Sequence, residues 1–262
     1  MKRAKSALAA PAGRFVLGLL GVLTALAIWY LATVDSTNIY FPALDRIVAE
    51  AAEYWTSEAG VHNLLASLKT LFAGLAIAIV AGIVIGLVIG QLSIVERVVS
   101  PALEFVRAIP ATALIPFAMM LFGVGTNMKI FLIALGCVWP VLLSTADGAR
   151  AVDRTLADSA RAFQITGLQR QRYIVLPAAT PRILVGIRIA IPIGLILMVT
   201  SEMVGSREGL GYVITQAQSS FRLLEMWSGI LLLGVLGFVL TFLYSLLERR
   251  LRRAVDPLAA RD

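Results

Sequence analysis

The sequence has little of what chemistry at a protein site usually requires. It contains one cysteine, Cys137, and one histidine, His62, among 262 residues. A lone cysteine forms no disulfide within its chain, and the two residues together cannot supply a thiol and imidazole metal cluster. A catalytic triad would have to use His62, and no partner motif surrounds this residue. We therefore expect no metal site and no catalytic residue in this chain.

Charged residues are also scarce. Only 15% of the residues are charged, 59% are hydrophobic, and the mean hydropathy is +0.86. A soluble protein of this length cannot bury so much apolar surface, so lipid must solvate most of it. The apolar stretches predict an all-α integral membrane protein with six transmembrane helices, at 15–34, 70–95, 98–122, 130–146, 183–200 and 227–247.

The spans divide the chain into segments of different character. Residues 1–14 form a basic tail, and we interpret 15–34 as the first transmembrane helix rather than a cleaved signal peptide, because Trp29 and Tyr30 stand where cleavage needs small residues. Residues 35–61 are acidic and predict an extracytoplasmic segment with an amphipathic helix after Pro42. Residues 62–250 form the transmembrane core, and 251–262 form a C-terminal tail.

The distribution of basic residues predicts the orientation. Sixteen of the 23 lysines and arginines fall in the segments on one side of the membrane, four on the other and three within spans. The positive-inside rule places both termini and residues 147–182 in the cytoplasm, in the inner membrane of a bacterium. The net charge of +7 thus reflects the orientation of the chain in the membrane. Because no aromatic-rich basic patch accompanies this charge, we expect no nucleic-acid partner.

Small residues recur every four positions in the second span, at Gly74, Ala78, Gly82, Gly86 and Gly90. In lipid, such a stripe lets a second helix approach closely, because packing rather than hydrophobicity holds transmembrane helices together. We predict that Gly82, Gly86 and Gly90 mediate helix packing.

Prolines and charges inside the spans predict a solute path, because such residues face a cavity or a protein partner rather than lipid. The third span holds Glu104 and Arg107 at the spacing of a helical ion pair. The predicted path and gate residues are Arg107, Pro110, Pro116, Met198, Glu202 and Met203. Two alternatives stay open: Glu202 pairs only with Arg207 or Arg188, and the methionines are plain packing residues.

The polar segment 147–182 holds six arginines and three aspartates. Val152, Leu156, Ala160 and Phe163 recur at helical spacing, which predicts an amphipathic helix that Gly167 ends. A second short helix, 169–176, is expected to end at Pro177. Two short helices between spans form a docking structure for a cytoplasmic partner.

The chain has no phosphate-binding Gly-x-x-x-x-Gly-Lys-Ser/Thr loop, so any ATPase that drives transport is a separate chain. The stretch 158–167, Asp-Ser-Ala-Arg-Ala-Phe-Gln-Ile-Thr-Gly, together with Ile-Val-Leu-Pro at 174–177, resembles the Glu-Ala-Ala loop of ABC importer permeases, with Gln164 in place of the glycine of that pattern. Residues 107–110, 114–116, 129–132 and 202–212 are similar to the taurine, aliphatic-sulfonate and nitrate branch of these permeases. The resemblance covers about residues 60–256.

The resemblance implies a type I importer permease fold and a transport subunit that is not an enzyme. It also implies a homodimer in membrane lipid, two ATPase subunits that bind ATP and magnesium, and an extracytoplasmic binding protein that delivers a small, anionic solute. This chain itself then needs no cofactor. The residues expected to couple it to the ATPase are Asp153, Arg154, Asp158, Ala160, Arg161, Phe163, Gln164, Gly167 and Pro177. Ala160 and Phe163 are expected to form the buried contact.

The sequence also has features of two other classes of membrane protein. Asp147-Gly148-Ala149-Arg150 suggests a CDP-alcohol phosphotransferase, but the spacing of the metal-binding pattern and its two later aspartates are missing. A secondary transporter would show internal repeats and a buried coupling carboxylate, for which Glu202 is the only candidate.

Overall fold

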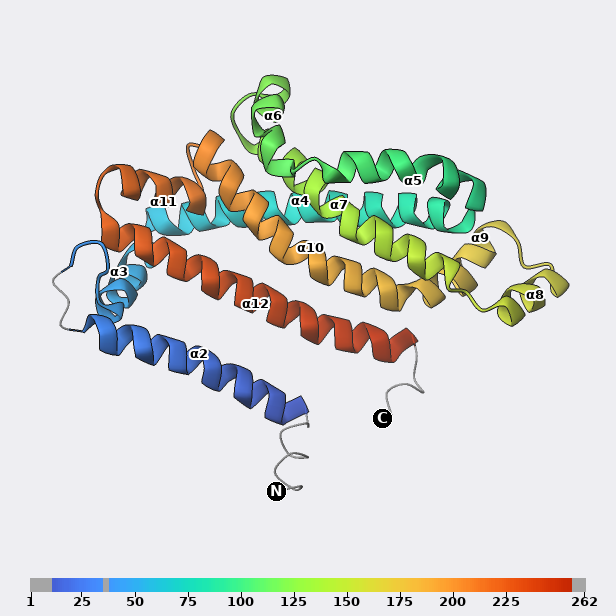
Figure 1. Cartoon of the computed structure of the whole chain (residues 1–262), viewed down its shortest axis with the longest axis horizontal. Helices are drawn as coiled ribbons and strands as arrows, with labels where there is room; N and C mark the ends of the chain where they lie inside the picture. The colour runs from blue at the N-terminus through green and yellow to red at the C-terminus, as the bar shows by residue number, and fades with distance from the viewer. Residues whose placement is uncertain (1–10, 35–37, 256–262) are drawn as a thin grey trace.

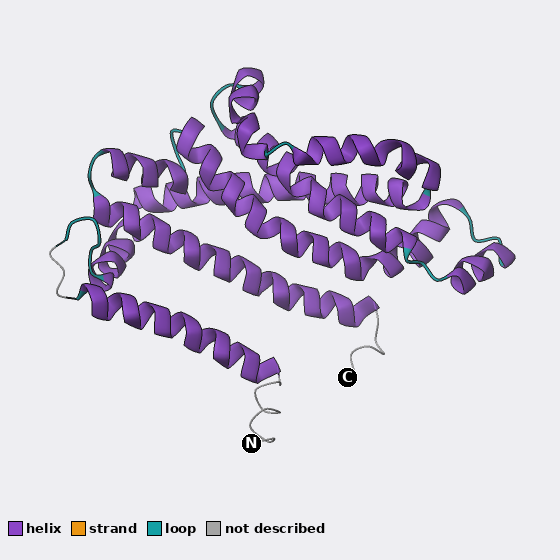
Figure 2. Ribbon diagram, in the orientation of Figure 1, coloured by secondary structure: helices purple, strands orange, loops and turns teal. Residues whose placement is uncertain are grey.

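The computed structural model describes residues 11–34 and 38–255, and this part of the chain is helical, without a strand (Figures 1 and 2). Its elements follow one another along the chain as α2 (Pro11–Thr33), α3 (Leu44–Thr56), α4 (Glu58–Gln91), α5 (Ser93–Ala108), the 3-10 helix η1 (Ala111–Leu114), α6 (Ile115–Phe122), α7 (Thr126–Arg150), α8 (Arg154–Ala162), α9 (Gly167–Arg170), the π-turn η2 (Gln171–Val175), α10 (Leu176–Gly205), α11 (Leu210–Ser219) and α12 (Leu223–Val255).

Four described helices are long and apolar enough to cross a bilayer: 58–91, 126–150, 167–205 and 223–252. A fifth span results if the bent pair 101–108 and 111–122 is counted as one. The predicted first span lies in α2. Within α2, the apolar helical stretch is Thr24–Thr33, which is too short to cross a bilayer alone. The all-helical class is therefore confirmed for the described residues, and the count of six spans stays a prediction.

The expected third span, 98–122, is not one helix. Its two halves meet at an angle of 75° after Ala108. Pro110 causes the break, because proline offers no amide hydrogen and drives the residue before it out of helical geometry; Ile109 has φ −75° and ψ 118°. Pro101 lies inside α5 without ending it, and Pro116 lies in the first turn of α6, where proline is well tolerated.

The expectation that a short helix ends at Pro177 is wrong. The helix continues from Gly167 to Gly205 through α9, η2 and α10, with Pro177 in the first turn of α10. Because the helix is continuous here, Pro177 offers no amide hydrogen to the preceding turn and removes one intrahelical hydrogen bond without ending the helix. The π-turn directly before it takes up the local change of helical register.

The core is the packing of α4, α7 and α10, which lie side by side along the long axis (Figure 1). Small residues set their separation. A Cβ atom added to Gly86 of α4 would lie 2.6 Å from the backbone oxygen of Leu142 in α7, and one added to Gly82 would lie 2.8 Å from Cβ of Val141. Gly148 of α7 meets Ala179 of α10 in the same way. The predicted stripe thus lies at a close contact between α4 and α7.

The two ends of the elongated molecule differ. Helices α3 and α11 lie at one end, and α8 and α9 lie at the other (Figure 1). The first residue of α2 and the last of α12 point toward the α8 end, so the chain begins and ends on the side of the polar loop as far as it is described. At the other end, Trp29 packs edge-on against Trp227 at 5.3 Å between ring centroids, and Trp55 donates a hydrogen bond to Ser228 at 3.2 Å.

We expect Gly86→Leu to separate α4 from α7, because the added side chain meets the backbone of Leu142 and the side chain of Thr145. Overpacking of a tight helix contact costs about 1–3 kcal/mol or more. The melting temperature of the detergent-purified protein measures the loss.

The matched control is Gly234→Ala in α12, where an added Cβ has nothing within 4 Å. It should melt as the wild type does. An unchanged melting temperature in Gly86→Leu would show that α4 and α7 are not held in this close contact.

Candidate functional site

The polar segment 147–182 folds into a protrusion at one end of the bundle. Asp153 caps α8, where its side chain accepts a hydrogen bond from the amide of Leu156 at 3.1 Å. This hydrogen bond stabilises the carboxylate and lowers the pKa of Asp153 below its usual value. At the other end of α8, the amide of Ile165 donates to the carbonyl of Ala160 at 2.8 Å, and the chain turns away from the helix axis.

The turn after α8 contains Gln164, the residue that departs from the family pattern. Gln164 stands where the pattern has glycine, and its φ is +54°. That is the left-handed region, which glycine enters at no steric cost and other residues enter rarely. Gln164 therefore adopts a backbone conformation that glycine would adopt without steric cost. Gly167, with φ +57°, makes the second bend of the loop.

The two residues expected to form the partner contact differ in exposure. Phe163 is 78% exposed, whereas Ala160 is 3% exposed and already covered by its own chain. A partner can therefore reach Phe163 directly, but a change at Ala160 would first disturb the loop itself. Asp158 and Arg161 are exposed and form an ion pair at 2.9 Å.

The remaining predicted coupling residues lie along the same protrusion. Gly167 begins α9, and Pro177 is half-buried where α10 begins. Arg154 begins α8, and its side chain lies outside the described parts of the structure.

A cavity of about 410 Å³ opens beside the bend between α5 and η1. Arg107 and Pro110, two of the predicted path residues, line it together with Trp139 and Pro140 of α7 and Ile193 of α10. Arg107 is the only charged residue among its described lining residues. The predicted ion pair with Glu104 does not form between these two exposed and described residues. Arg107 is therefore available to a solute.

The other predicted path residues do not line this cavity. Pro116 is exposed on α6, Met203 is 41% exposed near the outer end of α10, and Met198 is fully buried in the helical core. The structure thus brings together only Arg107 and Pro110. Trp139 and Ile193 were not predicted, since an apolar residue in a span gives no sequence signal that separates a cavity wall from a core position.

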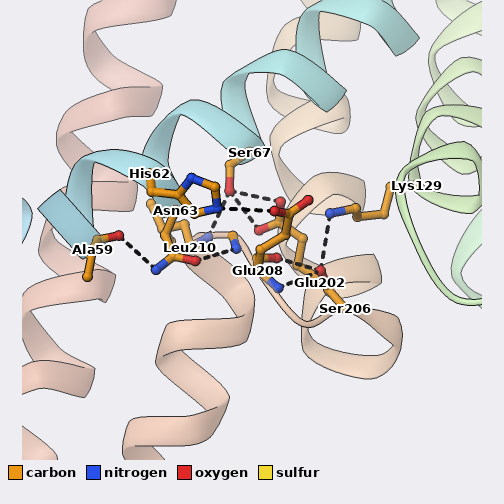
Figure 3. A network of polar contacts seen from close by, with 10 residues as sticks. Ala59, His62, Asn63, Ser67, Lys129, Glu202, Ser206, Glu208 and Leu210 are labelled. Atoms are coloured by element: carbon orange, nitrogen blue, oxygen red, sulfur yellow. Dashed lines mark hydrogen bonds and ion pairs between the residues drawn. The ribbon is translucent and has the colours of Figure 1, made fainter.

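Glu202 is 1% exposed and lies in a polar network that joins three helices (Figure 3). The hydroxyl of Ser67 in α4 lies 2.8 Å and 2.9 Å from the two carboxylate oxygens, and the amide of Gly211 in α11 donates at 2.9 Å. The amide of Leu210 donates to Ser67 Oγ at 2.7 Å. The alternative that Glu202 pairs with Arg207 or Arg188 is wrong, and Arg188 instead faces Glu248 at 3.8 Å.

Lys129 is the functional candidate that sequence reasoning missed. It was counted among the outer basic residues, yet it is fully buried and its Nζ donates to Ser206 Oγ at 3.1 Å (Figure 3). A lysine at the start of an apolar stretch usually extends to the interface. Lys129 instead lines an outer cavity of about 1090 Å³, together with His62, Asn63, Arg207 and Glu208. His62 is largely exposed and pairs with Glu208 at 3.3 Å.

The family profile described as the inner membrane component of binding-protein-dependent transport systems matches residues 65–253. This chain belongs to that family. Among its relatives is the putative aliphatic sulfonates transport permease SsuC of Bacillus subtilis, 32% identical over 238 residues, which cover 89% of this chain and 86% of the relative. The taurine transport permease TauC of Escherichia coli is 28% identical over 242 residues, with 90% and 87% covered.

Further relatives and solved structures agree with this assignment. The bicarbonate transport permease CmpB of Synechococcus elongatus is 28% identical over 216 residues, covering 82% of this chain and 75% of the relative. The fold resembles a structure of the MetNI methionine ABC transporter in inward-facing conformations, with a TM-score of 0.60 and 23% identity over 75% of this chain and 95% of that one. A structure of an amino acid ABC transporter aligns with a TM-score of 0.55 and 21% identity, over 74% and 92% of the two chains.

These relatives confirm the resemblance drawn from the loop residues. The permease is a multi-pass membrane subunit of an ABC importer and is not an enzyme. Membership of the family implies a binding protein and an ATPase as partners. The secondary transporter and the membrane phosphotransferase are not favoured.

Glu202→Ala should unfold the outer end of the permease more readily. The change leaves the Ser67 hydroxyl and the Gly211 amide without their acceptor. Each buried polar group without a partner costs about 1–3 kcal/mol, so we expect a clearly lower melting temperature.

Glu208→Ala is the matched control, because its carboxylate forms only an exposed pair with His62, worth at most about 1 kcal/mol. If the two variants melt alike, the Glu202 network does not stabilise the fold.

Proposed function

We propose that this permease carries a small anion of the sulfonate, taurine, nitrate or bicarbonate kind into the cytoplasm. The observation that carries the proposal is Arg107, the one charged side chain among the described residues around an otherwise largely apolar cavity. A guanidinium group offers two parallel donors to the oxygens of a sulfonate, nitrate or carboxylate. A charge at membrane depth is costly unless it serves a cavity or a partner. Three relatives carry aliphatic sulfonates, taurine and bicarbonate by name.

The working unit in this proposal is a homodimer whose solute path lies between the two copies. A set of apolar side chains on α5 and α6 supports a homodimer, because these side chains are exposed in the single chain. They are Val98, Phe105, Phe117, Met120 and Leu121. Lipid alone could cover such residues, but the cavity beside Arg107 also opens along α5 and η1. A second copy would close the cavity and leave Arg107 facing the solute.

Two ATPase subunits, which bind ATP and magnesium, complete the proposed assembly on the cytoplasmic side. The coupling loop, residues 147–182, would enter a groove of each ATPase through Phe163, with Asp153, Arg154, Asp158 and Arg161 around it. Its position at the same end as the start of α2 and the last residue of α12 supports cytoplasmic termini (Figure 1). The opposite end, with α3 and α11, would receive the binding protein. The fold is that of a six-span type I importer permease.

Arg107→Gln should lower ATP-dependent uptake of the transported anion in proteoliposomes containing the permease, its ATPase and its binding protein. Loss of a hydrogen bond to a charged group costs roughly 1.5–3 kcal/mol, so uptake should fall about tenfold or more. Arg107→Lys should retain part of the activity, since the charge remains but the planar pair of donors does not.

Arg97→Gln, on the same helix but not among the residues that line the cavity, is the control and should transport normally. Normal uptake by Arg107→Gln would refute an anion site at this position.

Phe163→Asp should uncouple ATP hydrolysis from uptake while the membrane fold stays intact. An exposed aromatic that becomes buried at an interface commonly contributes about 2 kcal/mol or more, and a carboxylate in its place would be desolvated without a partner. Co-purification of the ATPase and uptake per ATP hydrolysed measure the effect.

Phe163→Leu keeps an apolar contact and should remain coupled. Phe221→Asp changes an equally exposed aromatic outside the coupling loop, in a separate cavity that Pro42 and Arg222 also line, and should leave the ATPase bound. A transport-competent complex recovered with Phe163→Asp would contradict the proposed docking contact.

A further inference from the structure

One pair of glutamines joins the coupling loop to the end of α4. Gln91 is the last residue of α4, and Gln171 is the first residue of the π-turn η2. Gln91 Nε2 donates to Gln171 Oε1 at 3.0 Å, and Gln171 Nε2 donates to Gln91 Oε1 at 2.7 Å. Both side chains are half-buried. Two antiparallel hydrogen bonds between the side-chain amides fix both the distance and the relative rotation of these two groups.

This pair is the direct polar link between the loop and α4. Among the described side chains, no other hydrogen bond or ion pair connects residues 151–175 with a helix outside that segment. The loop is joined covalently to α7 and α10, so movement of the loop reaches those helices through the backbone. Among the described side chains of residues 151–175, it reaches α4 through packing and through the two glutamines.

Gln91 also stands at the start of the path toward Arg107. Leu92, directly after it, leaves helical geometry with φ −113° and ψ 93°, and α5 begins at Ser93. Helix α5 then leads to Arg107 and Pro110 in the cavity wall. A displacement of Gln171 therefore acts at Leu92, the junction between the core helix α4 and helix α5, which carries Arg107.

The π-turn makes Gln171 a special position in its helix. Residues 171–175 form a single π-turn inside a helix that runs from Gly167 to Gly205. Such turns are rare and occur frequently at functional sites, because the additional residue rotates everything before it relative to the helix that follows. Ile174 and Val175 are buried, at 7% and 1% exposed, which holds the far end of the turn in the core while Gln171 faces α4.

We propose that the Gln91–Gln171 pair is a positioning contact that transmits movement of the coupling loop to α4 and α5. In this role it determines how closely ATP hydrolysis is coupled to movement of the cavity wall at Arg107. The inference rests on the proposed function, because it assumes that an ATPase moves the loop. Neither glutamine touches the solute.

The test is a double-mutant cycle on the complete complex of permease, ATPase and binding protein in proteoliposomes. Gln91→Ala and Gln171→Ala should each lower uptake per ATP hydrolysed by roughly three- to tenfold, the range expected when one or two amide hydrogen bonds are lost. The double variant should be no worse than the stronger single variant, because all three lack the same interaction. Gln169→Ala is the matched control, since this exposed glutamine two residues away makes no described hydrogen bond.

A merely structural role would lower the melting temperature and leave uptake per ATP unchanged, and that result would overturn the proposal. Losses that add in the double variant would also overturn it, since they would place the two glutamines in separate interactions. Gln91→Glu is a milder variant that keeps the acceptor for Gln171 but loses the Nε2 group, which donates to Gln171 Oε1 and to the carbonyl of Leu87. It should fold normally with intermediate coupling, and fully wild-type coupling would count against the pair.

The controls separate this inference from the proposed function. A wild-type complex without ATP-dependent uptake would refute the proposed function itself. A wild-type complex that transports, with glutamine variants that remain fully coupled, would refute only the role of the pair.

Discussion

The close approach of α4, α7 and α10 is the constraint on which the other features depend. In lipid, apolar helices gain no hydrophobic free energy by meeting, so their association relies on packing and on interhelical hydrogen bonds. Gly82 and Gly86 let α4 approach the backbone of α7, and Gly148 lets α7 approach Ala179 in α10. Once these three helices are fixed relative to one another, the polar groups at their two ends are fixed as well.

The polar groups of the core gather at its ends. At the end that carries α3 and α11, Glu202 accepts hydrogen bonds from α4 and α11 and holds the segment after α10 in place. Near the end that carries α8 and α9, Gln91 and Gln171 hold the returning limb of the coupling loop against α4. Between these ends, the described lining of the cavity beside α5 offers one charge, Arg107. A rigid core with a polar contact at each end can carry movement from one side of the membrane to the other.

This arrangement suits a permease that contains no energy source of its own. The coupling loop exposes Phe163 while Ala160 is buried within the loop, as the proposed docking of a separate ATPase requires. The two halves of the segment formed by α5, η1 and α6 meet at 75° and expose apolar side chains along their length. In the proposed function, this bent segment is the wall of the solute path beside the packed core.

The sequence by itself determined the class and the family, because apolar length and the loop motif are properties of a chain read locally; the orientation from basic residue counts stays a prediction. It also located the small-residue stripe, since a four-residue period places those positions on one helix face whatever the fold. It failed where distant segments decide the outcome. Lys129 appeared to be an interfacial residue until Ser206, 77 positions away, provided its partner. Pro177 appeared to end a helix, because a π-turn has no sequence signature. The partners of Glu202, and the meeting of Gln91 with Gln171, follow only from tertiary packing, because hydrogen bonds between helices depend on relative helix positions that no local pattern encodes.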